Sequence, residues 1–160
     1  MSSRTIQARI PAGVADGQRI RIPGKGAPGE HGGKAGDLYV RVHVTPHAVF
    51  GRAGNDLTIR VPVTFTELAL GTTLDVPTLD GKVSLRVPPG TASGRVLRVR
   101  GKGIARRDGQ VGDLLVTLQV AVPGNMDSSA RAALETYAQA TSALDPRPEL
   151  TKLLQQRRES

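Results

Sequence analysis

Apolar and polar residues alternate in short stretches along most of the chain. From Leu57 to Val63 an apolar residue occupies every second position, which predicts a strand with one buried face. Leu74–Val76 begins another strand, and Asp80-Gly81 predicts a hairpin turn after it. Further short strands are predicted at 4–10, 18–22, 37–45, 82–87, 95–100 and 113–122. The pattern therefore indicates a mainly β protein.

Two parts of the chain have helical patterns instead. Thr64 to Gly71 predicts one or two helical turns, capped by Thr64 or Thr66 and stopped by Gly71. After Pro123-Gly124, Asp127 or Ser128 caps a longer helix, and its apolar face comprises Ala130, Ala133, Leu134, Tyr137, Ala138 and Thr141. Asp145-Pro146 breaks it before a short second helix, which begins at Glu149 and ends in Gln155-Gln156-Arg157-Arg158. Spacing alone favours equally a helix packed on the last sheet and a dimerisation arm.

An internal repeat organises the β-rich part. Residues 9–27 (RIPAGVADGQRIRIPGKGA) align with residues 86–104 (RVPPGTASGRVLRVRGKGI), 77 positions later, with the glycines in register. After a change of one residue in length, GDLYV at 36–40 matches GDLLV at 112–116. Each copy predicts a strand, a Pro-x-Gly turn, a second strand, a glycine-rich loop and a third strand.

The two copies are unequally complete. The second copy is preceded by the strands and helix predicted within residues 55–79, whereas eight residues precede the matched block of the first. We therefore expect two tandem β-sandwich-like units, the first truncated, followed by a helical tail. An unpaired sheet edge is expected near Ile6 to Ile10, and such edges tend to pair with another chain.

Composition limits the core and the choice of partner. Hydrophobic residues make up 38% and aromatic residues 2%, so the core must consist of Val, Ile and Leu. The net charge of +8 permits an alternative function, a basic interaction module that binds nucleic acid or ribosomes. However, arginines alternate with apolar residues, as in Arg19–Ile22 and Leu97–Arg100, which favours a solvated sheet face. The scarcity of aromatic residues for base stacking also makes nucleic acid the less favoured partner.

The residue patterns of known catalytic and metal sites are missing. The chain contains no cysteine and no Gly-x-Ser-x-Gly motif. Around Lys34 the P-loop pattern fails, because Pro28 replaces its first glycine and Ala35 its hydroxyl residue. His43 and His47 lie in a predicted strand and turn, where residues four apart do not converge on a metal. We expect no enzyme, no metal and no cofactor.

The repeated motifs resemble a known family. PAGVADGQRIRIPGKGAPG with GDLYVRVHVTPHAVFGRAGNDL, and VPTLDGKVSLRVPPG with RVRGKG and GDLLVTLQV, are similar to the C-terminal substrate-binding region of DnaJ-type J-domain co-chaperones. The resemblance covers residues 5–125. It implies two tandem β-sandwich-like domains followed by a dimerising C-terminal helix. It also implies binding of extended apolar segments of unfolded proteins and their transfer to the seventy-kilodalton heat-shock chaperone DnaK.

The resemblance also implies which residues carry the function. In the family an aromatic residue in a Pro-His-x-x-Phe stretch lines the peptide groove, and here it corresponds to Phe50, for which a position in the core between the domains is an equal alternative. We expect peptide contacts from Phe50, Val49, Ile6, Ile10, Leu38 and Val40. A homodimer would form through Leu134, Tyr137, Leu150, Leu153 and Leu154.

The chain departs from the family pattern in several places. It has no His-Pro-Asp motif, no Gly/Phe-rich linker and no cysteine-rich zinc module, so activation of the partner's ATPase is not expected. We expect a truncated first domain at 1–48, a second β domain at 49–125 and a helical tail at 126–160. No apolar run approaches the roughly 20 residues that span a bilayer, and a cytoplasmic protein is expected.

Overall fold

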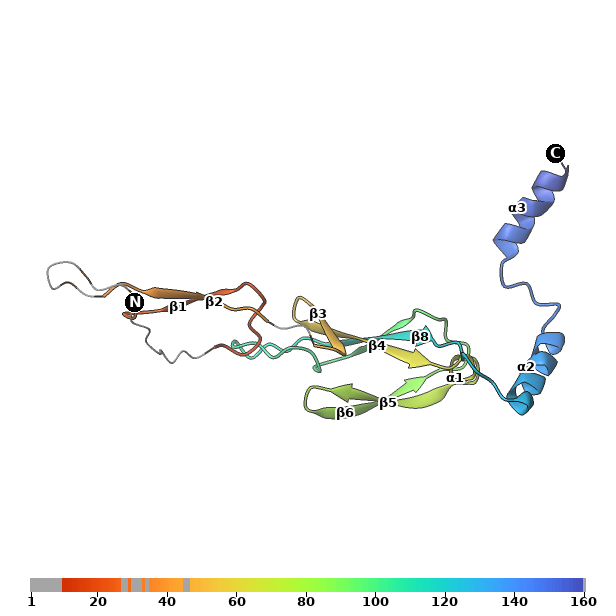
Figure 1. Ribbon diagram of the computed structural model, residues 1–160, viewed down its shortest axis with the longest axis horizontal. Coiled ribbons are helices and arrows are strands. Elements are labelled where there is room, and N and C mark those ends of the chain that lie inside the picture. Colours follow the sequence, from red (N-terminus) through yellow and green to blue (C-terminus); the bar gives the residue numbers. More distant parts are fainter. Residues whose placement is uncertain (1–9, 27–28, 30–32, 34, 45–46, 160) are drawn as a thin grey trace. The chain divides into compact units, whose positions relative to one another are not determined.

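The computed structural model describes residues 10–26, 29, 33, 35–44 and 47–159. The protein is mainly β with a helical tail, which confirms the expected fold class (Figure 1). Its elements in chain order are β1 (Arg19–Ile22), β2 (Leu38–Arg41), β3 (Phe50–Ala53), β4 (Asp56–Val63), α1 (Phe65–Leu70), β5 (Thr72–Thr78), β6 (Gly81–Val87), β7 (Val96–Val99), β8 (Leu114–Val120), α2 (Ser128–Ala140) and α3 (Pro148–Glu159).

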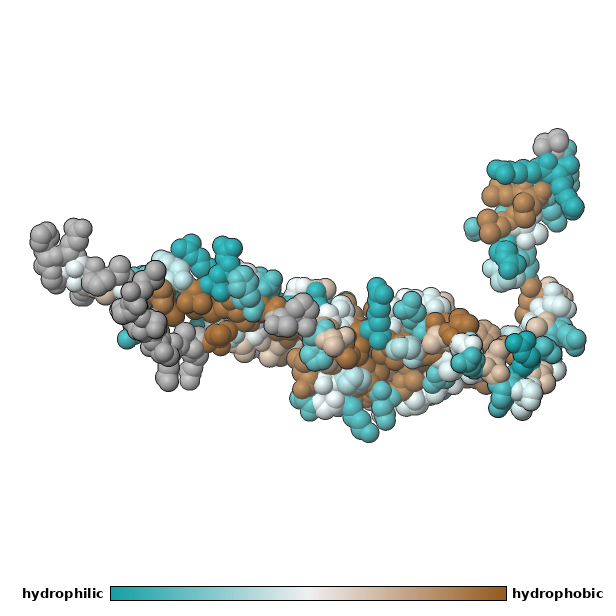
Figure 2. Space-filling model, in the orientation of Figure 1, coloured by the Kyte–Doolittle hydropathy of each residue, from teal (hydrophilic) through white to brown (hydrophobic). Residues whose placement is uncertain are grey.

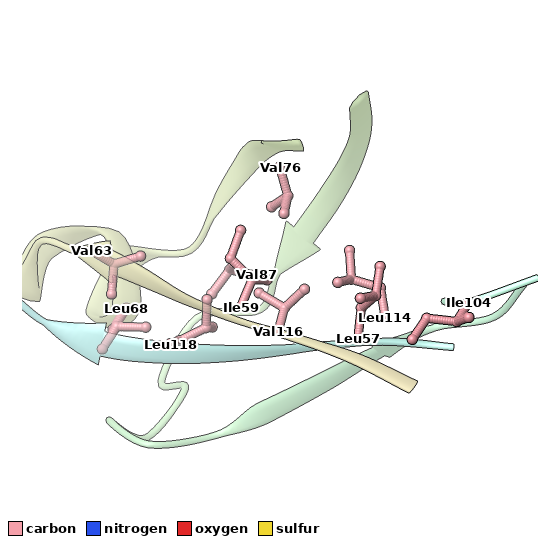
Figure 3. Close-up of a cluster of buried hydrophobic side chains, with 10 residues drawn as sticks. All are labelled: Leu57, Ile59, Val63, Leu68, Val76, Val87, Ile104, Leu114, Val116 and Leu118. Atoms are coloured by element: carbon pink, nitrogen blue, oxygen red, sulfur yellow. The ribbon is translucent and has the colours of Figure 1, made fainter. Parts of the chain in front are cut away.

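The second β unit, residues 50–121, is a small sandwich. One sheet has the strand order β3-β4-β8-β7, with β4 and β8 parallel and the other pairs antiparallel. The hairpin of β5 and β6 lies over one face of this sheet (Figure 3). Strand residues of both layers form the buried core together with Leu68 of α1 and Ile104 of the segment between β7 and β8. The core is aliphatic, as the composition predicts: Leu57, Ile59, Val63, Leu68, Val76, Val87, Ile104, Leu114, Val116 and Leu118.

The first β unit, residues 10–44, repeats part of this sandwich with the same register. β1 pairs with β2 as β7 pairs with β8: Ile20 lies opposite Val40, and Leu97 lies opposite Val116. The two turns also correspond, since the Gly17 amide donates to the Val42 carbonyl and the Gly94 amide to the Leu118 carbonyl, both at 2.7 Å. The repeat in the sequence is therefore a repeat of backbone hydrogen bonds.

The conserved spacing of glycine, arginine and aspartate within each copy also has a structural cause. In the second unit, the Asp113 carboxylate accepts hydrogen bonds from the Gly101 amide at 3.0 Å and from Arg98 Nη1 at 2.7 Å. In the first unit, the Asp37 carboxylate accepts from the Gly24 amide at 3.3 Å and pairs with Arg21 Nε at 2.8 Å. One aspartate in each unit thus ties the Gly-Lys-Gly loop to the strand before it.

The two units differ in how well their apolar faces are covered. Leu114 and Val116 are fully buried beneath β5 and β6, whereas their counterparts Leu38 and Val40 are half-buried. Among the described residues, β1 and β2 form a sheet of two strands. The predicted edge strand at 4–10 lies outside the described residues apart from Ile10, which is exposed.

The sequence pattern predicted α1 correctly but did not predict β3. Thr64 caps α1, accepting from the Glu67 amide while Glu67 accepts from the Thr64 amide, and Gly71 ends the helix with φ of 83°. Strand β3 was not predicted, because Phe50–Ala53 lacks an alternating pattern. It forms because the two-residue turn Gly54-Asn55 folds it back onto β4.

The helical tail forms a compact part of its own, which begins at Val122. Asp127 caps α2 through a 2.7 Å hydrogen bond from the Ala130 amide. The second helix lies close to its predicted extent: α3 begins at Pro148, which suits a first helical turn, and continues to Glu159. Neither helix contains a buried residue. The predicted domain division at 48/49 stays a prediction.

Truncation of a core leucine should destabilise the second unit more than truncation of its half-buried counterpart. Leu114→Ala should lower the free energy of unfolding by about 2–5 kcal/mol, because it leaves a cavity in the sandwich. Leu38→Ala is the matched control and should cost clearly less. Urea denaturation followed by circular dichroism measures both, and equal losses would contradict the difference in packing.

The Asp113 loop contact should make stability depend on acid pH. The Gly101 amide and the Arg98 guanidinium hold the pKa of Asp113 below its usual value of 3.8. Its ionised form therefore stabilises the fold above that value, and this contribution is lost as the pH falls through the lower folded pKa. Asp113→Asn should lower the melting temperature at pH 7, and the difference from wild type should shrink below about pH 3.8. Glu135→Gln, at an exposed site on α2, should change neither.

Candidate functional site

An open pocket lies beside the edge strand β3. Its volume is 450 Å³, and its lining comes from the segment leading into β3 and from β4: His47, Ala48, Val49, Phe50, Gly51, Thr58, Ile59 and Arg60. Because β3 is the last strand of the four-stranded sheet, one of its edges faces away from β4. The pocket thus combines an apolar wall with strand backbone.

Phe50 belongs to both the core and the pocket. It lies opposite Ile59 in the β3–β4 register and packs, half-buried, against the core cluster. The neighbouring Val49 is 51% exposed. Phe50 thus contributes both to the core of the second unit and to the lining of the pocket, and its role in peptide binding stays a prediction.

His47 shapes the entrance to β3. Its Nδ1 atom accepts hydrogen bonds from the backbone amides of Val49 at 3.0 Å and of Phe50 at 3.2 Å. The imidazole ring lies 5.2 Å from the Phe50 ring, measured between centroids, at an interplanar angle of 57°. Both contacts turn the chain sharply before β3, and this holds Val49 on the outside of the turn.

The other predicted peptide-contact residues lie elsewhere. Leu38 and Val40 belong to the half-buried apolar face of the first unit, which they share with Ile20 and Ile22. On the side shown in Figure 2, apolar residues gather over β1 and β2. Ile10 belongs neither to β1 or β2 nor to the lining of the pocket. Ile6 lies outside the described residues. The structure therefore brings Val49 and Phe50 together and keeps Leu38 and Val40 on a second surface.

Sequence reasoning missed most of the pocket. Thr58 and Arg60 point away from the core on β4, and they enter the site because β3 pairs with β4. Gly51 faces Thr58, and a Cβ atom there would lie 2.5 Å from the Thr58 hydroxyl. The Gly-Asn pair at Gly54-Asn55, a hairpin signal, was the clue that could have placed β3 beside β4.

Titratable groups do not gather into a reactive cluster in the described part of the chain. Within it, no group of three or more His, Cys, Asp or Glu residues could hold a metal ion. The acids with lowered pKa, such as the exposed Asp75 and the partly exposed Asp113, are bonded to structural partners. Of the described helices, none is long and apolar enough to cross a membrane.

The predicted dimer residues occupy the two tail helices. Leu134 and Tyr137 lie on α2, and Leu150, Leu153 and Leu154 lie on α3. All five are exposed, the most exposed being Leu154 at 65%. In Figure 2, α3 shows apolar residues on one side and hydrophilic residues on the other.

These features define a tandem β-repeat protein with a helical tail and, at a sheet edge, an open pocket that is partly apolar. The family model of the DnaJ C terminal domain matches residues 1–123. "Chaperone protein DnaJ 2" of Mycolicibacterium paratuberculosis is 65% identical over 147 residues, which cover 91% of this chain and 38% of that protein. "Chaperone protein DnaJ 1" of Streptomyces avermitilis is 63% identical over 150 residues, covering 93% and 38%. "Chaperone protein DnaJ 1" of Mycobacterium tuberculosis is 61% identical over 147 residues, covering 91% and 37%.

The chain belongs to the DnaJ C-terminal domain family, since the family model matches most of its length. It spans 38% of the length of the first two of these relatives. The resemblance inferred from the repeated motifs is thereby confirmed.

Proposed function

We propose that this chain is a chaperone module that holds extended apolar segments of unfolded proteins. The observation that carries the proposal is the 450 Å³ pocket, in which Val49 and Phe50 present apolar surface next to the edge strand β3. An extended peptide recognised this way adds backbone hydrogen bonds along a strand and places a side chain in the pocket. Burial of one apolar side chain contributes about 1.5–3 kcal/mol, which suits weak binding of many sequences.

The half-buried face of the first unit is the second surface that supports client binding. Ile20, Ile22, Leu38 and Val40 together present an aliphatic strip on two paired strands. The same strip in the second unit is covered by β5 and β6. A client that covers this strip would remove a similar apolar surface from water.

The relatives' names support a proposal about the partners of the chain. We propose that it acts without enzymatic activity of its own, in the cytoplasm, as a co-chaperone that delivers clients to a DnaK-type chaperone. The relatives carry the name chaperone, and this chain shares most of its length with them.

Client binding should weaken when the pocket loses an apolar side chain. Val49→Ser should raise the dissociation constant for a fluorescent extended peptide rich in Leu and Phe by roughly fivefold, as expected for a loss of about 1 kcal/mol. Val96→Ser is the matched control, because Val96 is 52% exposed and lies on β7 at the opposite edge of the sheet. Fluorescence anisotropy measures both variants. Equal affinities for the two would contradict the pocket.

Ionic strength separates client binding from phosphate-driven binding of nucleic acid. Peptide affinity in the pocket should change little between 50 and 200 mM salt, because apolar contacts provide it. Binding that neutralises phosphates would fall steeply over the same range, by about 10³-fold or more for six contacts. A steep fall in affinity for the peptide itself would argue against the apolar pocket.

We further propose that two chains associate through the tail. Because α2 and α3 bury none of their own residues, their exposed leucines and Tyr137 offer apolar surface to a second copy.

Removal of the α3 leucines should separate the dimer. The triple variant Leu150→Ser, Leu153→Ser, Leu154→Ser should lower the solution mass from twice the chain mass of 16.9 kDa to the chain mass itself. Leu79→Ser, an equally exposed leucine between β5 and β6, is the control and should leave the mass unchanged. Multi-angle light scattering measures the solution mass. A triple variant that keeps the dimer mass would refute dimerisation through α3.

A further inference from the structure

Arg52 makes contacts that join the two β units. It lies on β3, opposite Leu57 of β4, and belongs to the second unit. Its guanidinium group donates to the carbonyl oxygens of Gly13 at 2.8 Å and of Val14 at 2.7 Å, both in the first unit. Its Nε atom donates to the carbonyl of Gly54 at 2.7 Å, in the β3–β4 turn. One planar group therefore connects the turn at Gly13 with the β3–β4 turn, although Arg52 and Gly13 are 39 residues apart in the chain.

Gly13 shows how closely the units approach at this point. Its φ is +75°, and a Cβ atom there would lie 2.6 Å from the Ala105 carbonyl and 3.0 Å from the Ile104 side chain. Ile104 is part of the core of the second unit, and its amide donates to the Asn55 carbonyl at 2.9 Å. The turn at Gly13 thus rests on a fixed part of the second unit.

The repeat supplies an internal comparison for this glycine. Gly90 is the counterpart of Gly13 and has nearly the same φ, +76°, but nothing lies within 4 Å of its virtual Cβ. The backbone shape of the turn is common to both units, whereas the close approach exists at Gly13. Its cause is therefore the contact between the units and not the turn itself.

The same turn also holds the start of the connection between the units. The Asp16 carboxylate accepts a hydrogen bond from the Val44 amide at 2.9 Å, where the chain leaves β2. Arg52, on β3, donates to the carbonyls of Gly13 and Val14 in the same turn. The residues of one turn, Gly13 to Asp16, thus contact both ends of the connecting segment.

We propose that Arg52 is a positioning residue that locks the first β unit onto the second through this turn. Arginine suits the role because its donors are spread over a rigid plane and reach several carbonyls at once, whereas the lysine ammonium is a single point. Val49 lies three residues before Arg52, and Leu38 and Val40 lie on the first unit. The lock therefore sets the spacing of the two apolar surfaces through which, in the proposed function, a client is held.

Distances between spin labels on the two units test the lock without any client. The chain has no cysteine, so Arg41→Cys on β2 and Gln119→Cys on β8 give two unique labelling sites at exposed positions. The distance distribution between the labels should be narrow in the parent protein. Arg52→Ala and Arg52→Lys should both broaden it by roughly twofold or more, because neither side chain reaches the three carbonyls.

A second test variant, Gly13→Ala, and matched control variants accompany the Arg52 substitutions. Arg86→Ala removes the same charge from an exposed position on β6 and should leave the distribution narrow. Gly13→Ala should broaden it, whereas Gly90→Ala, with equal backbone strain, should not. Circular dichroism melting verifies that the second unit stays folded in every variant. A narrow distribution in both the Arg52 variants and Gly13→Ala would overturn the proposal, whatever the outcome of the client assay.

Discussion

The parallel pairing of β4 with β8 is the constraint on which the rest of the structure depends. It joins Leu57–Val63 to Leu114–Val120 along seven residue pairs. The pairing is closed at one end by the Asp56 carboxylate, which accepts the Asp113 amide at 2.7 Å, and at the other by the Ala121 amide, which donates to Val63 at 2.8 Å. Because these strands carry most of the buried leucines and valines, the core exists only when they meet. Strand β3, and with it the pocket, forms on the free edge of β4.

The two β units share their local structure and differ in how far their apolar faces are covered. The same glycines, the same aspartate and the same strand register recur in each unit, so one local solution serves twice. What differs is the covering layer: β5 and β6 bury the second copy of the strip, and the first copy stays half-buried. Local geometry is thus duplicated, while burial is not. Apolar surface that is folded but incompletely covered is the feature that a client-holding protein requires.

The pocket and the joint between the units are built from neighbouring residues of one short segment. His47 fixes the turn before β3, Phe50 anchors the strand in the core, and Arg52 reaches the first unit. Residues 47–52 therefore both present apolar surface and fix the position of the other unit. Phe50 and Arg52, two residues apart, lie on the same side of the strand.

The sequence by itself determined the strands of the repeat, the turns at its glycines, helix α1 with its cap, the aliphatic core and the family. Each of these follows from short-range patterns: alternation, capping residues and matched spacing of glycines. The sequence did not reveal β3, the lining by Thr58 and Arg60, or the role of Arg52. These depend on pairing between strands and on contacts between distant turns, for which neighbouring residues carry little signal. Only the tertiary structure decided that Phe50 belongs to both the core and the pocket, because the pairing of β3 with β4 brings this residue next to both.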